Sequence, residues 1–370
     1  MTVKKITGKI HLWLGLVSGI IVVFLGITGC MLAFENEIRS LTESYREVTP
    51  LQQPLLPPTQ LKQLAEQSLT SKKALGIEYP AKDKAALAYY YDDDNFELVF
   101  LNPYTGAILK HKNMNKDFFR IITEGHYYLW LPARIGQPIV ASATLIFLIM
   151  MISGLILWWP VNKAAAKQRF SIKWSAKWRR KNYDLHNVLG FYMTWITIFI
   201  AITGLIWGFQ WFAKSVYWVT SGGHIAEEHT DPVSDTTSPA PAVNIADLLW
   251  QQHIKELPAN EGVSVWFAGS NAAPIEVTVN HRPGTYYNSD NYHYDQYTGK
   301  ELPAAGSYAG KFSDAKFADK IVRMNYDIHV GAVLGLPGKI LAFCGSLIAA
   351  SLPITGFLIW WGRKKKRLRV

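Results

Sequence analysis

The sequence predicts a mainly α-helical membrane protein: a bundle of four transmembrane helices built by an internal duplication, with two small α+β domains outside the bilayer. Of the 370 residues, 49% are hydrophobic and only 18% are charged, whereas soluble globular chains carry roughly 25% charged residues. Four apolar runs are long enough to cross a bilayer, which takes about 20 residues. The runs and the segments between them repeat one set of motifs, which indicates the duplication.

The four apolar runs cover residues 10–34, 135–159, 185–212 and 338–362. The connection between the second and third runs is short and basic, and the other two connections are much longer. Short basic segments remain in the cytoplasm. Trp158-Trp159 and Trp360-Trp361 lie where two of the runs meet the basic side, as in an interfacial aromatic belt. We therefore expect both termini and the middle loop to be cytoplasmic and the two long segments to face outward.

The distribution of charge excludes nucleic acid as a partner, although the formal net charge is +10. Residues 1–10, 161–182 and 363–370 hold 17 of the 38 basic residues and no acidic one, which leaves a net charge of −7 on the rest. Basic charge beside apolar runs predicts contact with the lipid bilayer. Cys30 and Cys344 both lie inside apolar runs and offer neither a disulfide framework nor zinc-ligand spacing.

Each apolar run is associated with one histidine and one Ile-Thr-Gly or Ile-Ser-Gly motif. The histidines are His11, His126, His186 and His329, and the motifs occupy residues 27–29, 152–154, 202–204 and 354–356. The long segments repeat as well, since NPYTGAIL at 102–109 matches DQYTGKEL at 295–302. We interpret the chain as two copies of a unit of helix, outer domain and helix.

Each long segment predicts a small α+β domain. Helical patterns cover residues 61–69 and 246–257, and strand patterns cover residues 86–91, 96–101, 263–267 and 275–279. The two Tyr-Thr-Gly sequences predict turns between strands, because glycine accepts a positive φ. The expected organisation is helix 1 in 1–36, the first outer domain in 37–119, helix 2 with its preceding segment in 120–160, the basic loop in 161–183, helix 3 in 184–213, the second outer domain in 214–322, and helix 4 with the basic tail in 323–370.

The four histidines are the candidate site residues, because an ionisable residue in or beside a membrane span is usually functional. His11 and His186 lie near the cytoplasmic edge, and His126 and His329 lie near the outer edge. Two imidazoles on facing helices suit the two axial positions of a haem iron, whereas zinc usually takes three or four protein ligands. The alternative interpretation is that the histidines are polar residues anchoring helix ends at the interface.

Charged neighbours could support such sites. Arg180 on the inner side, and Arg134 and Arg323 on the outer side, are candidate counter-ions for haem propionates. Acids precede three of the histidines by two residues and could either orient the ring nitrogens or cap helices; they are Glu124, Asp184 and Asp327. His224 and His229 in the second long segment could bind a metal or line a substrate site, but a solvated loop is the favoured interpretation of this segment.

These motifs resemble the PepSY-associated transmembrane proteins, which include di-haem siderophore reductases of the FoxB type and PiuB-like iron-uptake proteins. The resemblance rests on histidines that open helices, the Ile-Thr/Ser-Gly motifs, the basic middle loop and the two Tyr-Thr-Gly segments. It implies two b-type haems ligated by His11, His126, His186 and His329, and two PepSY-like periplasmic domains on a bacterial inner-membrane protein. It also implies that electrons pass from a cytoplasmic or quinol donor to ferric siderophores in the periplasm.

The sequence departs from this pattern at Lys9, which stands where an acid would precede His11, and no residue marks a siderophore pocket or a catalytic group. No G-x-G-x-x-G sequence opens a helix, so we expect the donor to be a protein or a quinol. Two alternatives stay open: a haem subunit that serves a separate periplasmic reductase, and a non-enzymatic PepSY membrane protein that binds peptide or regulates a protease.

Overall fold

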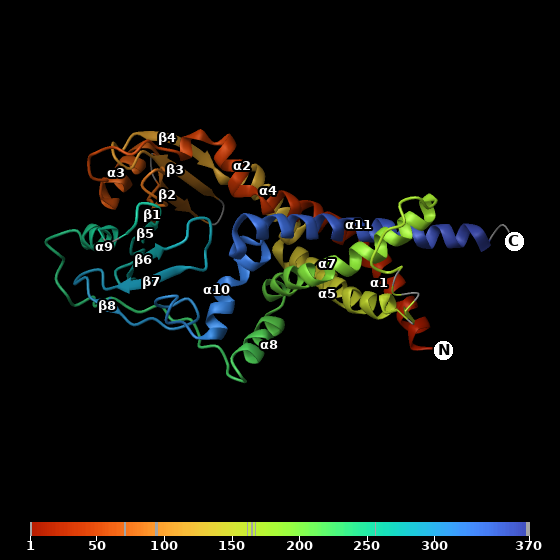
Figure 1. Cartoon of the computed structure of the whole chain (residues 1–370). Coiled ribbons are helices and arrows are strands. Elements are labelled where there is room, and N and C mark those ends of the chain that lie inside the picture. Colours follow the sequence, from red (N-terminus) through yellow and green to blue (C-terminus); the bar gives the residue numbers. More distant parts are fainter. Residues whose placement is uncertain are drawn as a thin grey trace. The chain divides into compact units, whose positions relative to one another are not determined.

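The computed structural model describes residues 2–69, 72–92, 95–160, 162–163, 166, 168–255 and 257–367. The chain divides into two compact units (Figure 1). The helical unit contains the chain up to Glu35, Ile122–Ser215 and the chain from Asn325 onward. The sheet unit contains Asn36–Ile121 and Val216–Met324. Each unit is therefore assembled from segments far apart in the sequence.

Four long helices form the helical unit: α1 (Val3–Ala33), α5 (Ala133–Trp158), α7 (Trp178–Gly208) and α11 (Gly335–Arg367). All four are long and apolar enough to cross a membrane, which confirms the four predicted spans. The helices pack in a ring, in which α1 and α7 each contact both α5 and α11. The predicted mainly helical class with a four-helix bundle is thus confirmed.

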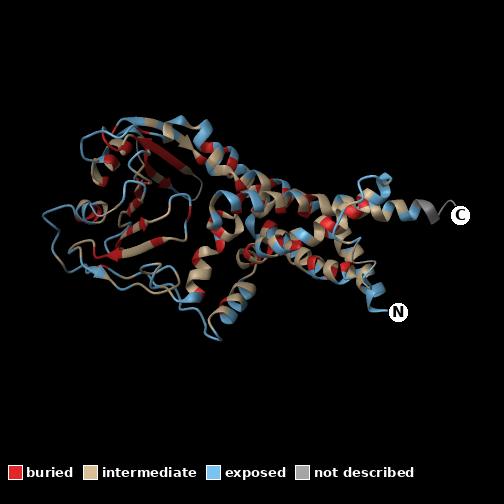
Figure 2. Ribbon diagram, in the orientation of Figure 1, coloured by how far each residue is buried: buried red, intermediate tan, exposed pale blue. Residues whose placement is uncertain are grey.

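Small residues allow these helices to approach closely. A Cβ added at Gly26 of α1 would lie 2.7 Å from the Ser346 carbonyl oxygen of α11, and one added at Gly208 of α7 would lie 2.6 Å from the Ala141 Cβ of α5. Such contacts provide the packing that holds helices together in lipid, where apolar burial alone gives no driving force. Large apolar residues such as Ile20, which is 84% exposed, lie on the surface of the bundle. Exposed and partly exposed segments recur along the long helices (Figure 2).

Three shorter helices adjoin the long ones in the chain: one precedes α5, one follows α7 and one precedes α11. They are α4 (Phe118–Tyr128), α8 (Gln210–Thr220) and α10 (Phe317–His329). The chain leaves α4 through Leu129 and Trp130, which have φ values of 55° and 57°. After α10, Gly331 (φ 79°) begins the turn that leads through the short helix η3 (Ala332–Leu334) into α11.

One eight-stranded antiparallel sheet forms the sheet unit, in the order β4-β3-β2-β1-β5-β6-β7-β8. The strands are β1 (Gly76–Tyr79), β2 (Ala86–Tyr91), β3 (Phe96–Leu101), β4 (Ile108–Asn113), β5 (Gly262–Trp266), β6 (Ile275–Asn280), β7 (Ser289–Tyr294) and β8 (Glu301–Leu302). Sequence analysis assigns one small domain to each long segment, yet β1 of the first pairs with β5 of the second. This pairing satisfies the backbone groups that two separate sheets would leave on exposed edge strands.

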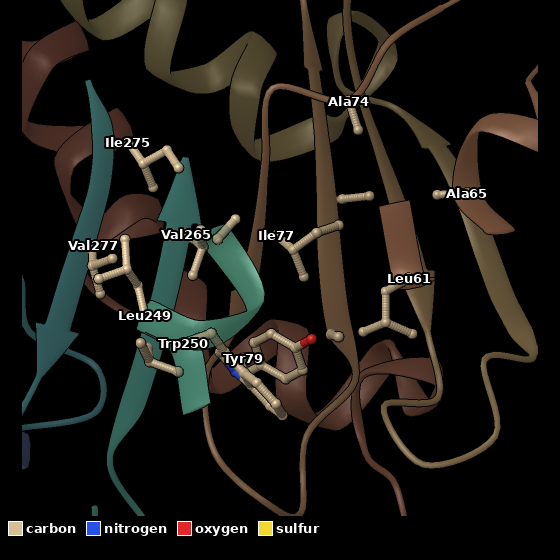
Figure 3. Close-up of a cluster of buried hydrophobic side chains, with 14 of the residues drawn as sticks. Leu61, Ala65, Ala74, Ile77, Tyr79, Leu249, Trp250, Val265, Ile275 and Val277 are labelled. Carbon is tan, nitrogen blue, oxygen red and sulfur yellow. The ribbon is translucent and has the colours of Figure 1, made fainter. Parts of the chain in front are cut away.

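The short helices α3 (Pro58–Ser68) and α9 (Ile245–Ile254) supply the main core of the sheet unit. Leu61 of α3 and Trp250 of α9 belong to one buried cluster with Ile77 and Val265, which are paired in register on β1 and β5 (Figure 3). Residues paired directly across a sheet share a face, so Ile77 and Val265 point to the same side of the sheet. A second cluster around Phe100 and Leu87 includes alternate residues on the other face.

The two predicted Tyr-Thr-Gly turns are confirmed. Asn102 accepts hydrogen bonds from the backbone N–H groups of Tyr104 and Thr105, and Asp295 accepts the equivalent bonds in the second half. The turns end at Gly106 and Gly299, whose φ values are 74° and 71°. The duplication is thus visible in the backbone conformation of both halves.

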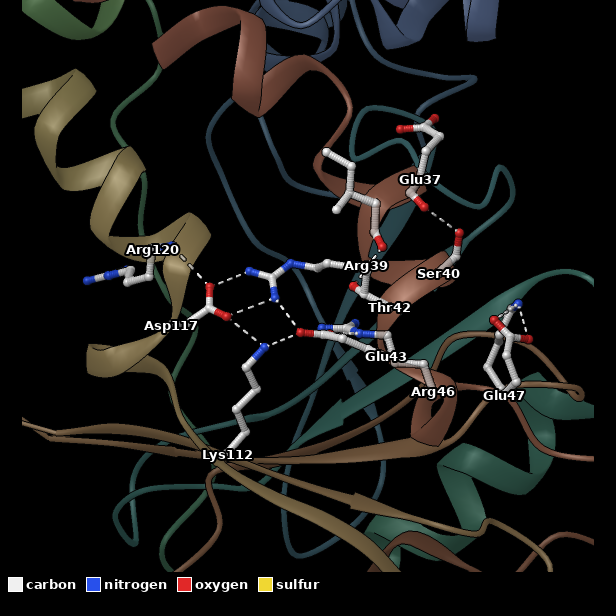
Figure 4. Close-up of polar contacts among 12 residues, drawn as sticks. Glu37, Arg39, Ser40, Thr42, Glu43, Arg46, Glu47, Lys112, Asp117 and Arg120 are labelled. Carbon is white, nitrogen blue, oxygen red and sulfur yellow. Dashed lines mark hydrogen bonds and ion pairs between the residues drawn. The ribbon is translucent and has the colours of Figure 1, made fainter. Parts of the chain in front are cut away.

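A buried ion-pair network ties helix α2 (Glu35–Thr42) to the end of β4 (Figure 4). The Arg39 guanidinium donates to both carboxylate oxygens of Asp117, and the Lys112 ammonium lies 2.6 Å from Asp117 Oδ2. Lys112 also pairs with Glu43, which in turn accepts from Arg46. Most of these charged side chains are shielded from water. Each therefore depends on its oppositely charged partners to offset the cost of burying its charge.

Candidate functional site

The four repeated histidines all lie in the helical unit, at His11 of α1, His126 of α4, His186 of α7 and His329 at the end of α10. The rings of His126 and His329 have centres 6.2 Å apart and planes inclined by 74°. His11 and His186 lie on α1 and α7 of the same unit. The structure therefore brings together the outer pair that was predicted from depth along the spans.

Every one of these histidines contacts the hydroxyl of an Ile-Thr/Ser-Gly motif through Nδ1. The Nδ1-to-hydroxyl distances are 2.9 Å for His11 and Ser153, 2.8 Å for His126 and Thr28, 2.9 Å for His186 and Thr355, and 2.9 Å for His329 and Thr203. Within each half of the duplicated chain, the contacts are thus reciprocal. The first long helix supplies a histidine to the motif of the second, and the motif of the first receives the histidine of the short helix that precedes the second. Because Nδ1 is engaged, Nε2 is the ring nitrogen left for a metal ion.

The glycine of each motif lies beside the same ring that the hydroxyl contacts. An added Cβ would lie 3.5 Å from Cε1 of His11 at Gly154 and 3.6 Å from Cε1 of His126 at Gly29. The corresponding distances are 3.2 Å for His186 at Gly356 and 3.3 Å for His329 at Gly204. Sequence analysis identified the motifs and the histidines separately, but their pairing depends on which helices are neighbours.

Two asparagines strengthen the second half of this arrangement, and sequence analysis gave them no role. Asn182 donates to the Thr355 carbonyl at 3.1 Å, and Asn325 donates to the Thr203 carbonyl at 3.2 Å. Each lies four residues before its histidine, one helical turn away, in the near-identical sequences NYDLH and NYDIH. The recurrence of Asn at that spacing was the signal that could have revealed them.

The acids that precede the histidines do not have the predicted capping role. Asp184 lies inside α7, whose N-cap is Lys177, and it pairs with Arg180 at 2.8 Å. Glu124 and Asp327 likewise lie inside α4 and α10. The N-cap interpretation of the two aspartates is therefore wrong, and at Nδ1 the rings contact hydroxyl groups and not these acids.

The three candidate arginines are placed differently from one another. Arg180 pairs with Asp184 and remains 44% exposed, and Arg134 is exposed in the first turn of α5. Arg323 lies in the sheet unit, 3% exposed. Its guanidinium donates to the backbone carbonyls of Ser289, Ser307, Ala309 and Gly310. Arg323 therefore holds a loop of that unit, in place of the role expected for it beside a propionate.

A cavity of about 390 Å³ opens beside the outer pair and is lined by both His126 and His329. Its volume falls within the range of small-molecule and cofactor sites, about 300–1,000 Å³. Gly29 and Gly204 line it too, and Trp207 adds an aromatic wall with its ring centre 5.3 Å from that of His329. The walls are mostly apolar, and the two imidazoles face the space together with polar side chains such as Gln137, Thr197 and Ser346.

The separation of the outer rings fits two axial ligands on one metal ion. Metal–imidazole bonds are about 2.0–2.1 Å, and a ring centre lies about 1.1 Å beyond its nitrogen, so two ligands on opposite sides of one ion have centres roughly 6.3 Å apart. The observed distance is 6.2 Å. A hydrogen-bonded Nδ1 is a further feature of such a ligand.

A zinc-like cluster finds no support in the part of the chain that the structure describes, where no group of three or more His, Cys, Asp or Glu residues could hold a metal ion. His229 is exposed and pairs with Asp231 at 2.8 Å, while His224 is exposed in the same segment. These contacts agree with the solvated-loop interpretation of residues 224–229.

Comparison with known proteins gives one assignment. No curated protein matches the chain. The family model described as PepSY-associated TM region matches residues 9–363, a range that contains all four paired histidines and all eight strands. The chain therefore belongs to the PepSY-associated transmembrane family and is a multi-pass membrane protein with four candidate spans.

Proposed function

We propose that this protein is a di-haem electron carrier of the bacterial inner membrane, which reduces ferric siderophores on the outer side. The observation that carries the proposal is the fourfold arrangement of a histidine, a hydroxyl and a glycine. Four equivalent imidazoles, grouped in two pairs with Nδ1 already engaged, are what two bis-histidine haems require. Anchoring of helix ends would require neither the pairing nor the adjacent glycines.

Each pair draws one histidine from each half of the duplicated chain. His11 and His186 would hold an inner b-type haem, and His126 and His329 would hold an outer one. Haem supplies reversible one-electron transfer when it is bound. The protein contributes ring orientation through the hydroxyls, room through the glycines, and an apolar cavity that excludes water from the outer site.

The direction of transfer follows from the expected topology. The basic segments would keep both termini in the cytoplasm, so that a cytoplasmic or quinol donor serves the inner pair. Siderophores bind Fe(III) through hard oxygen ligands, and these hold the softer Fe(II) less well. Reduction at the outer side would therefore favour release of iron from the chelate.

The test is a haem count on purified protein expressed with ample haem, by reduced-minus-oxidised spectra and pyridine haemochrome assay. We expect two low-spin haems per chain in the wild type and one in either His186→Ala or His329→Ala. His224→Ala, which changes an exposed histidine of the sheet unit, should keep both. A colourless wild-type protein would overturn the proposal.

The substrate requires a second measurement. The dithionite-reduced protein, freed of excess reductant, is mixed with a ferric hydroxamate siderophore and an Fe(II) trap. We expect the haem bands to return to the oxidised form as the trap complex appears. Two haems that stay reduced would instead favour the alternative of a haem subunit serving a separate periplasmic reductase.

A further inference from the structure

The hydroxyl groups that contact the four histidines each have only one proton, and a backbone carbonyl lies in position to receive it. The hydroxyl oxygen lies 2.9 Å from the Phe24 carbonyl for Thr28 and 3.1 Å from the Met150 carbonyl for Ser153. The equivalent distances are 2.7 Å to Phe199 for Thr203 and 3.0 Å to Ser351 for Thr355. Back-bonding of this kind is the usual arrangement for serine and threonine inside helices.

A hydroxyl whose proton is donated to a carbonyl can only accept from the imidazole. Nδ1 must then carry the ring proton and donate it to the hydroxyl oxygen, which leaves the Nε2 lone pair unprotonated.

The opposite tautomer would be unfavourable at the outer pair. A proton on Nε2 would need an acceptor, and no hydrogen bond to Nε2 of His126 or His329 occurs among the described residues. An unpaired N–H in a mostly apolar cavity is disfavoured.

We infer that Thr28, Ser153, Thr203 and Thr355 are positioning residues, which fix each histidine as the Nδ1–H tautomer and so present Nε2 to a metal ion. The part of this inference that concerns haem rests on the proposed function, whereas the tautomer itself does not. At the outer pair, Thr28 is the Nδ1 partner of His126 and Thr203 is the Nδ1 partner of His329.

The test compares Thr28→Val, Thr28→Ser and Thr203→Val with wild type in the full chain. Thr194→Val is the matched control, because Thr194 is also buried and back-bonded in a long helix, 2.7 Å from the Gly190 carbonyl, without a histidine contact. Partners that hold a metal-ligating histidine contribute 10–100-fold to metal affinity. We expect Thr28→Val and Thr203→Val each to weaken haem binding at the outer site by about 10–100-fold.

Two further readouts separate positioning from a loss of packing. The midpoint potential of the outer haem should rise in Thr28→Val, because a ligand that no longer donates from Nδ1 is less basic and stabilises the ferric state less. Thr28→Ser should restore both affinity and potential. Unchanged potential and affinity in Thr28→Val, or equal losses in the Thr194→Val control, would overturn the inference.

The tautomer can be measured without haem. Nitrogen-15 NMR of histidine-labelled, haem-free protein in lipid should show a protonated Nδ1 and an unprotonated Nε2 for His126, and Thr28→Val should change that signal. The reverse tautomer in the wild type would overturn the inference even if haem binds. If the wild type binds no haem but shows the Nδ1–H form, the proposed function fails and the tautomer assignment stands.

Discussion

Nδ1 of His126 lies 2.8 Å from Oγ1 of Thr28, so the histidine of α4, the helix before the second span, is held by a residue of the first span. The reciprocal contact joins His11 of the first span to Ser153 of the second. The second half of the chain repeats both contacts. Each half therefore supports its own two histidines, while each histidine pair takes one member from each half.

At the two tighter positions, Gly204 and Gly356, the glycine should be needed to leave room for the ring. In Gly356→Leu, the added Cβ would start 3.2 Å from Cε1 of His186, and the longer side chain would displace the ring. We expect the purified variant to retain one haem per chain, at the outer site. Gly362→Leu is the control, because nothing lies within 4 Å of a Cβ added there. Two haems in Gly356→Leu would contradict the role assigned to the glycine.

Replacing the glycine of a Tyr-Thr-Gly turn by alanine should destabilise the protein by different amounts in the two halves of the chain. Gly106→Ala and Gly299→Ala each place an L-residue at a positive φ, at a cost of about 1–2 kcal/mol. At Gly106 the new Cβ would also lie 2.3 Å from the Leu64 Cδ1, whereas at Gly299 the nearest atom is 3.5 Å away. Denaturant unfolding of the full chain in detergent should therefore show the greater loss of stability for Gly106→Ala. Equal losses would mean that the Leu64 side chain moves aside freely.

The ion-pair network predicts a loss of stability in acid. Burial opposes ionisation of Glu43, but hydrogen bonds from Lys112 and Arg46 more than offset it and lower its pKa to about 2. A carboxylate with a lowered pKa stabilises the fold fully above its ordinary pKa near 4.5, and this contribution is lost as the pH falls toward 2. In thermal melts, Glu43→Gln should be less stable than wild type at pH 6, and the gap should close toward pH 2. Glu47→Gln, at a residue 43% exposed, should show little difference at either pH.

His281 predicts the opposite dependence. Burial disfavours its charged form, but Asp290 and Glu261 on either side of the ring overcome this and raise its pKa. The carboxylates lie 3.0 Å from Nε2 and 2.6 Å from Nδ1. A raised pKa gives stability that is complete below the unfolded value near 6.5 and is lost as the pH rises through the folded value.

The measurement for His281 is a pair of thermal melts at pH 5.5 and pH 8.5. His281→Gln should be less stable than wild type at the lower pH and close to it at the higher pH. His224→Gln, at an exposed residue, should follow the wild type at both. A gap that grows with pH would show that the ring stabilises the fold in its neutral form.

Much of the architecture could be predicted from local pattern. The apolar length of the spans predicted α1, α5, α7 and α11, and the strand patterns at 86–91 and 96–101 match β2 and β3 residue for residue. These features depend on hydrophobic periodicity and length, which neighbouring residues determine. The strand β1 was not predicted because its four residues, GIEY, are too short to show a pattern.

The sequence by itself determined the four spans, the duplication and the identity of the four histidines, because each is encoded in residues close together in the chain. The tertiary structure decided what these residues contact. That Thr28 faces His126, that Asn325 supports Thr203 and that β1 joins β5 depend on residues 98, 122 and about 190 positions apart. Only the packing of the helices and the pairing of edge strands brings such residues within hydrogen-bond distance, and no local pattern specifies either.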